Sequence, residues 1–525
     1  MFKFRRALAM LAVLLAPFHI VGAAPGAVVR TDAGAVRGER AAGLDVYRGL
    51  PFAAAPLGEL RWREPAPVPP WPDVRPATSF APACMQQGVS MPGETPPEVS
   101  EDCLYLNIWT PAKRARGPLP VIVWIHGGGY NNGSASMALY HGDALARRGV
   151  VVVTLAYRLG ALGFLAHPAL TLESPHQTSG NYGLLDQIAA LRWIQGNIAA
   201  FGGDPRRVTI AGQSAGAMSV SALLAAPSAR GLFHGAIAQS GGIFEPLQLA
   251  PGYQQANAER AGAAFAETRG AATLAQLRAL PATRLLGGDA EALAHPVVDA
   301  HVLPLTPYEA YVQGRQHDVP LLLGSNAEEA RSLVDVAAVT AADFAAGVER
   351  SVGRLPPALL AAYPAADDAQ AREARLGLER DLRFGWDMWA WARLQAAAGG
   401  RPAYYYAFSQ RPPFPPASPY AGWGASHFAE LWYMFDHLPQ APWSWHDGDR
   451  ALADSMARYW VNFARSGNPN GAGLPRWPAF GGADAADQVL HLGAFIGAGG
   501  VAHLERLRVF DAVYDGVRGR PFGMR

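Results

Sequence analysis

Three short apolar, β-branched runs constrain the fold of this chain more than any other feature. They are residues 120–125, 150–154 and 208–211. Continuous runs of this kind are typical of strands that are buried on both faces of a sheet. The segments 136–148 and 184–200, which separate the runs, have helical patterns. Strands that alternate with helices predict an α/β fold with a mostly parallel central sheet and flanking helices.

The rest of the sequence reads as additions to this sheet. Residues 28–47 predict short strands, and the Pro-rich segment 51–76 fits no helix. After Gly242, four Ala-rich segments predict helices and two runs predict further strands, at 256–269, 273–280, 341–352, 369–398, 321–323 and 404–408. With 50% hydrophobic and 17% charged residues, the chain can bury a large core. We therefore expect one domain over residues 24–525, enlarged by helical insertions.

The N-terminus resembles a signal peptide. It has a basic stretch through Arg6, an apolar run over residues 7–15 and small residues ahead of Pro25. The apolar run is shorter than the roughly 20 residues that a membrane-spanning helix needs. We therefore expect cleavage after about residue 23 and export to the periplasm or the medium, with no stable membrane span.

The charge of the chain gives no reason to expect a nucleic-acid partner. Loss of the three basic residues in segment 1–23 changes the net charge from +1 to −2. A protein that binds nucleic acid or an acidic membrane usually carries a basic surface. The oligomeric state stays open at this stage.

The chain has two cysteines, Cys84 and Cys103. Exported proteins fold in oxidising compartments, where such a pair tends to form a disulfide. The bridge would close a loop rich in Gly, Pro and Met. The chain-entropy model predicts that closing a loop of this length raises the free energy of unfolding by about 3 kcal/mol. The alternative is a pair of buried free thiols.

A candidate nucleophile follows the third buried run. Gly212-Gln213-Ser214-Ala215-Gly216 stands between this predicted strand and a predicted helix at 217–224. That is the context of a nucleophile elbow, a sharp turn that exposes a serine hydroxyl, and its two glycines leave room for the turn. The N-terminus of the helix would place the N–H of Ala215 beside the reacting centre.

A second Gly-rich segment, His126-Gly127-Gly128-Gly129-Tyr130, follows the first buried run. Consecutive glycines let the backbone bend, so the N–H groups of Gly128 and Gly129 can converge with that of Ala215. We expect these three groups to form an oxyanion hole. His126 is expected to support the shape of the loop rather than transfer protons.

Several long segments, found in the right order over nearly all of the mature chain, resemble the type-B carboxylesterase family. This family includes cholinesterases and bacterial para-nitrobenzyl esterases. The similar segments are residues 49–53, 101–107, 180–187, 201–205, 212–216 and 463–469. The resemblance implies an α/β-hydrolase fold and a serine carboxylic-ester hydrolase.

A serine hydroxyl needs a base and an orienting carboxylate before it can attack an ester. The order nucleophile, acid, histidine favours His427, whose Gly-rich segment resembles the catalytic-histidine loop of the family. Other histidines in the C-terminal part lack this context: His437, His446, His491 and His503. Matching to the family motif assigns the acid to Glu329, with the adjacent Glu328 as its rival.

The expected reaction passes through an acyl-enzyme on Ser214, with His427 as proton carrier and Glu329 as the group that stabilises the imidazolium. No organic cofactor is expected. No cluster of histidines and cysteines has the spacing of metal ligands, so no metal is expected either.

Two departures from the family argue against choline esters. Gln213 stands where many relatives have Glu, which removes a negative charge from the pocket. The loop between Cys84 and Cys103 contains no tryptophan, where cholinesterases use one to hold a quaternary ammonium group. The small residues of segment 290–294, which shapes the acyl pocket in relatives, predict a roomier acyl side.

We therefore expect hydrolysis of small to medium uncharged esters. Two alternatives remain at this stage. Some members of the family have lost catalysis and act in binding or adhesion, and the same chemistry can act on lipids, thioesters, lactones or amides.

Overall fold

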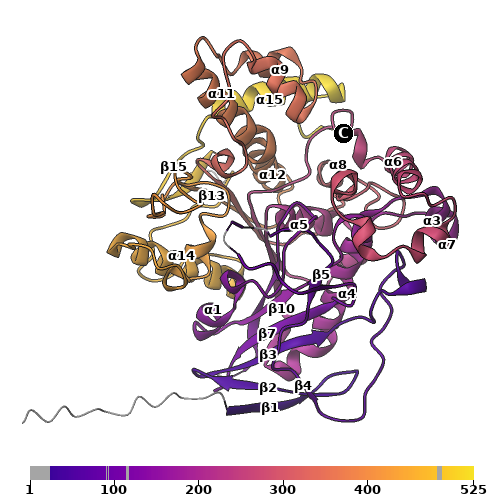
Figure 1. Cartoon of the computed structure of the whole chain (residues 1–525). Helices are drawn as coiled ribbons and strands as arrows, with labels where there is room; N and C mark the ends of the chain where they lie inside the picture. The colour runs from indigo at the N-terminus through magenta and orange to yellow at the C-terminus, as the bar shows by residue number, and fades with distance from the viewer. Residues whose placement is uncertain (1–23, 90, 93, 114–116, 482–486, 525) are drawn as a thin grey trace, which may run out of the picture.

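The computed structural model describes residues 24–89, 91–92, 94–113, 117–481 and 487–524 (Figure 1). The signal peptide expected at residues 1–23 lies outside the described residues. A large twisted sheet crosses the molecule. In spatial order its strands are β1 (Ala24–Arg30), β2 (Ala35–Ala41), β3 (Leu44–Pro51), β7 (Tyr105–Pro111), β9 (Val151–Leu155), β8 (Leu119–Ile125), β10 (Gly203–Gln213), β11 (Gly235–Gln239), β12 (Leu321–Asn326), β13 (Ala403–Phe408), β14 (Gln488–Leu492) and β15 (Ile496–Gly500).

The centre of the sheet is parallel and its two ends are antiparallel. The neighbouring strands from β9 through β8, β10, β11, β12 and β13 to β14 all pair in parallel. The strands from β1 to β7, the β7–β9 pair and the β14–β15 pair are antiparallel. The predicted α/β class with a mostly parallel sheet is confirmed.

The side chains of β8 show why this strand has no polar positions. Val121, Val123 and Ile125 belong to the core on one face of the sheet, and Ile122 and Trp124 to the core on the other. The first core includes residues of α4 (Tyr182–Asn197), α5 (Ala215–Ala225) and α12 (Trp386–Ala397). The second includes residues of α1 (Asp143–Arg147) and α14 (Asp447–Ser466). Because both faces are covered, the strand is continuously apolar.

The predicted helix over residues 136–148 is confirmed only in its second half. This segment forms a 3₁₀ turn at Ala138–Tyr140 and the short helix α1. Gly142, which precedes α1, lies so close to β9 that an added Cβ would stand 2.4 Å from the Cβ of Val152. Direct packing of the backbone on the sheet therefore replaces the first helical turns.

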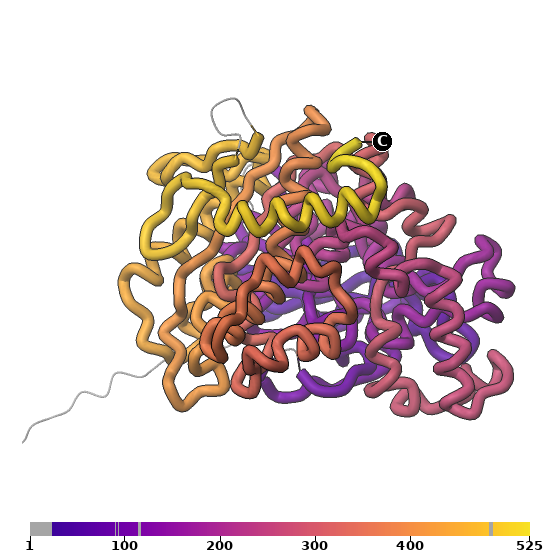
Figure 2. The backbone as a smooth tube through the Cα atoms, turned by 90° about the horizontal axis from the view of Figure 1, so that it is seen from above, coloured from indigo at the N-terminus to yellow at the C-terminus, as the bar shows by residue number. Residues whose placement is uncertain are grey.

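Helical segments are inserted in the chain after the turn at Ser214, as predicted. They include α6 (Gln255–Thr268), α7 (Leu274–Ala279), α8 (Pro307–Val312), α9 (Phe344–Val352), α10 (Pro357–Ala361) and α11 (Asp368–Arg380). The last helix, α15 (Leu504–Arg518), contacts α10 and α12 and lies beside this insertion in Figure 2. The segment predicted as one helix over 369–398 comprises α11, a π-helical turn η9 (Asp381–Gly385) and α12.

Cys84 and Cys103 form a disulfide, as predicted, with their Cα atoms 4.9 Å apart. Both residues are buried. Cys84 ends the short strand β5 (Ala83–Cys84), which pairs with β6 (Val99–Ser100) inside the closed loop. The bridge therefore anchors a loop whose residues Val89 and Pro92 line a cavity of about 900 Å³.

Replacement of both cysteines by serine is expected to lower the free energy of unfolding by about 3 kcal/mol, because the unfolded chain gains the conformational freedom of the opened loop. Denaturant unfolding of the oxidised wild type and the double variant measures the difference. Reductant should destabilise the wild type and leave the variant unchanged. Equal stability of the two oxidised proteins would contradict this account.

Candidate active site

Ser214 occupies a sharp turn between β10 and α5. Its backbone has φ 57° and ψ −128°, a region that L-residues with a side chain rarely adopt. The turn brings its two glycines into contact, since a Cβ on Gly212 would lie 2.4 Å from the carbonyl carbon of Gly216. A Cβ on Gly216 would lie 2.1 Å from the oxygen of Ile125. The predicted sharp turn between strand and helix is therefore present, and only glycine fits at both positions.

Ser214 opens into a cavity of about 900 Å³. The two glycines expected to form the oxyanion hole, Gly128 and Gly129, line this cavity together with Ala215 and His427. Gly128 has φ +106°, and a Cβ there would lie 2.1 Å from the oxygen of Asn132. The backbone of the Gly-rich loop thus follows a path that leaves no room for a side chain at Gly128. This path brings the loop to the cavity of Ser214.

His126 is fully buried and does not line this cavity. Its Nδ1 lies 2.9 Å from the oxygen of Gly127, and its ring stacks on Tyr157 with centroids 4.5 Å apart. The Tyr157 hydroxyl donates to the carbonyl of His126 at 2.8 Å. Burial lowers the pKa of His126 to about 4, so the ring is neutral at pH 7 and supports the loop, as expected.

His427 and Glu329 meet in a dry environment. The Nδ1 of His427 lies 2.6 Å from the Oε2 of Glu329, and both side chains are at most 1% exposed. The other carboxylate oxygen of Glu329 accepts the backbone N–H of Asn326 at 2.7 Å. Phe384, from the π-helical turn, stacks on the imidazole with centroids 4.6 Å apart. Glu329 and Phe384 therefore hold the ring from two sides, and Asn326 holds the carboxylate.

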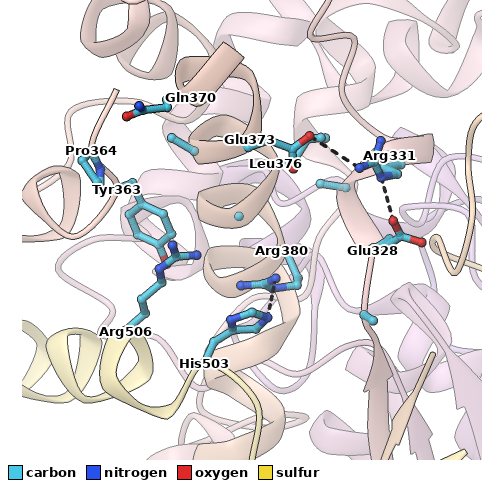
Figure 3. A pocket seen from close by; sticks show the side chains of 14 residues that line it. Glu328, Arg331, Tyr363, Pro364, Gln370, Glu373, Leu376, Arg380, His503 and Arg506 are labelled. Carbon is cyan, nitrogen blue, oxygen red and sulfur yellow. Dashed lines mark hydrogen bonds and ion pairs between the residues drawn. The ribbon is translucent and has the colours of Figure 1, made fainter. Parts of the chain in front are cut away.

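Glu328, the rival of Glu329, points elsewhere. Its carboxylate pairs with Arg331 at 2.9 Å and with Arg411 at 2.6 Å, and it accepts the N–H of Ala425. Figure 3 shows Glu328 and Arg331 on the wall of a separate cavity, which also contains Glu373. The structure therefore brings Glu329, and not Glu328, to His427.

None of the other C-terminal histidines lines the cavity of Ser214. His437 is buried against Leu139 and Asp143. His446 precedes α14, and His491 lies in β14 near Gly500. The Nε2 of His503 accepts a hydrogen bond from the guanidinium of Arg380 in the cavity of Figure 3.

The structure shows a contact that the sequence did not predict. The amide nitrogen of Gln213 lies 3.1 Å from Nε2 and 3.3 Å from Nδ1 of His427. Because it is almost equally far from both ring nitrogens, the amide lies against the imidazole and not along the in-plane lone pair of Nε2. No hydrogen bond joins Ser214 to His427 within the described ranges.

Glu430 is a second buried carboxyl near His427 and Glu329. It accepts hydrogen bonds from Gln239 at 3.1 Å and from Asn326 at 2.5 Å. Burial, followed by the charge of Glu329, raises the pKa of Glu430 to about 7. Its position three residues after His427 was a signal in the sequence, but the partners that surround it come from β11 and β12 and only the fold brings them together.

Two further acidic residues line the cavity, Glu245 and Asp387. Burial raises the pKa of both groups, and the charge of Glu245 raises that of Asp387 further. Both shifts favour the protonated carboxyl, which is neutral and can donate a hydrogen bond. The sequence gave no indication of this pair, because its members are far apart in the chain.

Segment 290–294 does not shape this cavity, contrary to the expectation from the sequence. Ala290 and Leu293 pack in a separate apolar cluster with Trp62 and Leu162. No residue of the segment lines the cavity that contains Ser214. The walls are formed instead by residues of the helical insertion, among them Val352, Leu355 and Leu359.

Comparisons with known proteins agree with this geometry. The profile of the carboxylesterase family matches residues 25–496. Fumonisin B1 esterase of Sphingopyxis macrogoltabida is 37% identical over 495 residues, which cover 90% of this chain and 88% of the relative. Cocaine esterase of Oryctolagus cuniculus is 37% identical over 494 residues, which cover 86% of this chain and 89% of the relative.

Solved structures agree as well. A PNB esterase superposes with a TM-score of 0.79 and 32% identity, and the match covers 92% of this chain and 99% of that chain. A thermophilic PNB esterase gives a TM-score of 0.80 at 32% identity and the same coverage.

The raised pKa of Glu430 generates a prediction about stability. Between about pH 4.5 and 7 the unfolded carboxyl is ionised while the folded one keeps its proton, so wild-type stability falls as pH rises through this window. Glu430→Gln removes this loss, which is at most about 3 kcal/mol. Relative to the wild type, the variant should gain stability from pH 5 to pH 7.5 in urea unfolding.

Glu328→Gln is the matched control for this experiment. Burial raises the pKa of Glu328, but the hydrogen bonds from Ala425 and Arg411 outweigh it and the pKa is lowered overall. Its stabilising effect is present at neutral pH and is lost as the pH falls. The control variant should therefore lose stability relative to the wild type at pH 7.5. If both variants gained stability at pH 7.5, or both lost it, the raised pKa would not belong to Glu430.

Proposed function

The chain belongs to the carboxylesterase family, and from this premise we propose that Ser214, His427 and Glu329 hydrolyse carboxylic esters through an acyl-enzyme. Carboxylic-ester hydrolysis itself follows from the family match and from the esterases among the relatives. The assignment of roles to residues is our proposal. It is supported above all by the 2.6 Å contact between the buried side chains of His427 and Glu329, at the edge of the cavity that contains Ser214.

In the proposed reaction, Ser214 attacks the ester carbonyl while His427 accepts the hydroxyl proton. The N–H groups of Gly128, Gly129 and Ala215 stabilise the negative charge that develops on the carbonyl oxygen. His427 then protonates the leaving alcohol. Water, activated by the same imidazole, attacks the acyl-enzyme and releases the acid and the free serine.

Glu329 stabilises the imidazolium that forms in both halves of the reaction. We assign to Gln213 a positioning role, in which its neutral amide lies against the imidazole of His427.

The proposed substrates are small to medium uncharged esters. A cavity of about 900 Å³ accommodates a ligand of that size. The raised pKa values of Glu245 and Asp387 favour neutral carboxyls in its wall. The wall therefore offers hydrogen bonds to a substrate and little negative charge that would attract a cationic one. Lipid, thioester, lactone and amide substrates share the same chemistry and are distinguished by the panel below.

We also propose export and a single mature domain over residues 24–525. The disulfide supports export, because such bonds persist in oxidising compartments. None of the helices in the described parts of the chain is long and apolar enough to cross a membrane. The family profile spans the described chain from β1 to β15, which supports one domain.

The two neighbouring glutamates provide a test of the acid. Glu329→Gln is expected to lower kcat by about three to four orders of magnitude, because the amide no longer stabilises the imidazolium. Glu328→Gln is the control, and its effect should stay below about tenfold. Both rates are measured on a p-nitrophenyl ester with circular dichroism as a check on folding. The reverse ranking would assign the acid to Glu328.

The nucleophile is tested by a panel of p-nitrophenyl esters of increasing acyl length, together with a fluorophosphonate label. The wild type should turn over uncharged esters and take up one label, and peptide mapping should locate it on Ser214. Ser214→Ala should lose both properties, since no other described serine occupies such an elbow. A wild type that neither reacts with the label nor turns over any ester would instead favour the binding or adhesion role.

A further inference from the structure

Three potential metal ligands converge on the surface, away from the cavity of Ser214. They are Glu64, His176 and His301, and one donor atom from each lies within 4.8 Å of the other two. They come from distant segments: Glu64 follows the turn at Gly58–Leu60, His176 follows α3 (Pro168–Glu173), and His301 precedes α8. Spacing in the sequence could not reveal this cluster.

We propose that Glu64, His176 and His301 bind one Zn²⁺ ion. Glutamate oxygen and histidine nitrogen are ligands that zinc accepts, with bonds of about 2.0–2.2 Å. In a tetrahedral site with such bonds, neighbouring ligand atoms are about 3.3–3.5 Å apart. The Oε1 of Glu64 lies 3.3 Å from Nε2 of His176 and 3.5 Å from Nε2 of His301. Both separations equal an edge of that tetrahedron.

The same separations are too long for strong hydrogen bonds. N–H···O bonds in proteins are about 2.9–3.0 Å long, and charge-assisted ones are shorter. Nearby Arg278 and Glu173, for comparison, are 2.6 Å apart. The carboxylate oxygen of Glu64 thus lies near both imidazole nitrogens at distances that leave room for a cation among the three atoms.

The two imidazole rings stack face to face, with centroids 3.6 Å apart and planes 7° from parallel. Because the lone pair of a ring nitrogen lies in the ring plane, the rings must tilt toward each other to share an ion. Their exposure permits this movement, since the side chains of His176 and His301 are 41% and 29% exposed. Glu64 is similarly free, at 48%.

The backbone beneath these side chains is firmly held. Asp299 accepts the backbone N–H groups of His301, Val302 and Leu303 at 2.7–3.0 Å. Two residues ahead of Glu64, the indole N–H of Trp62 donates to the carbonyl of Ala161 at 2.8 Å. An anchored backbone reduces the conformational entropy that is lost when the ligands assemble around an ion.

The site differs from the catalytic cavity in both place and role. Glu64 and His301 line a separate pocket of about 280 Å³, which shares no lining residue with the cavity of Ser214. Three protein ligands leave a fourth position for water. The ion ties together three loops, so its effect is on stability and not on ester hydrolysis.

Binding is tested by calorimetric titration of tag-free, EDTA-treated protein with ZnCl₂. The wild type should bind one equivalent, and its thermal unfolding temperature should rise as zinc saturates the site. His176→Ala, His301→Ala and Glu64→Gln should each weaken binding by at least about tenfold, because each removes a direct ligand. Hydrolysis of a p-nitrophenyl ester, measured in parallel, confirms that these surface variants fold.

His491→Ala provides the matched control, because it removes a partly exposed histidine from β14, whose Nε2 contacts the oxygen of Gly500. This variant should bind zinc as the wild type does. Anomalous scattering at the zinc edge should place the ion between Glu64, His176 and His301. The proposal is overturned if the tag-free wild type shows no saturable binding, or if binding survives in the double variant His176→Ala/His301→Ala.

Discussion

The strained turn at Ser214 is the constraint on which the rest of the active site depends. Its positive φ requires close support on every side: Gly212 and Gly216 touch each other, and Gly216 lies against the oxygen of Ile125 at the end of β8. Strain of this kind persists only where surrounding structure over-determines it. The parallel sheet, covered on both faces, supplies that rigidity, and the Gly-rich loop after β8 reaches the same point.

The ionisable groups around His427 are buried. His427, Glu329 and Glu430 are almost completely excluded from water, and a buried charge is tolerated only when partners satisfy it. Glu329 has the imidazole and the N–H of Asn326, whereas Glu430 has the side chains of Asn326 and Gln239. Burial, followed by the charge of Glu329, raises the pKa of Glu430, so Glu430 holds its proton to higher pH.

The helical insertions form much of the wall of the cavity at Ser214. The elbow and the oxyanion loop come from the sheet, but the far walls of the cavity come from the turn before α12 and from the segment that carries α9 and α10. Insertions of this type vary most between relatives. The family match therefore shows ester hydrolysis, whereas our proposal on substrate size rests on the cavity that these insertions line.

The sequence by itself determined the alternation of buried strands and helices, the elbow at Ser214 and the chain order that pointed to His427. Each of these features depends on residues that are close in the sequence. The spacing of apolar residues and the positions of glycines follow from the local geometry of strands, helices and turns. Only the tertiary structure decided that Glu329 rather than Glu328 meets the imidazole, that Gln213 and Glu430 adjoin it, that segment 290–294 lies elsewhere, and that Glu64, His176 and His301 converge. These features depend on side chains that meet across long loops, and no local pattern records which residues the folded backbone will bring within a few ångströms.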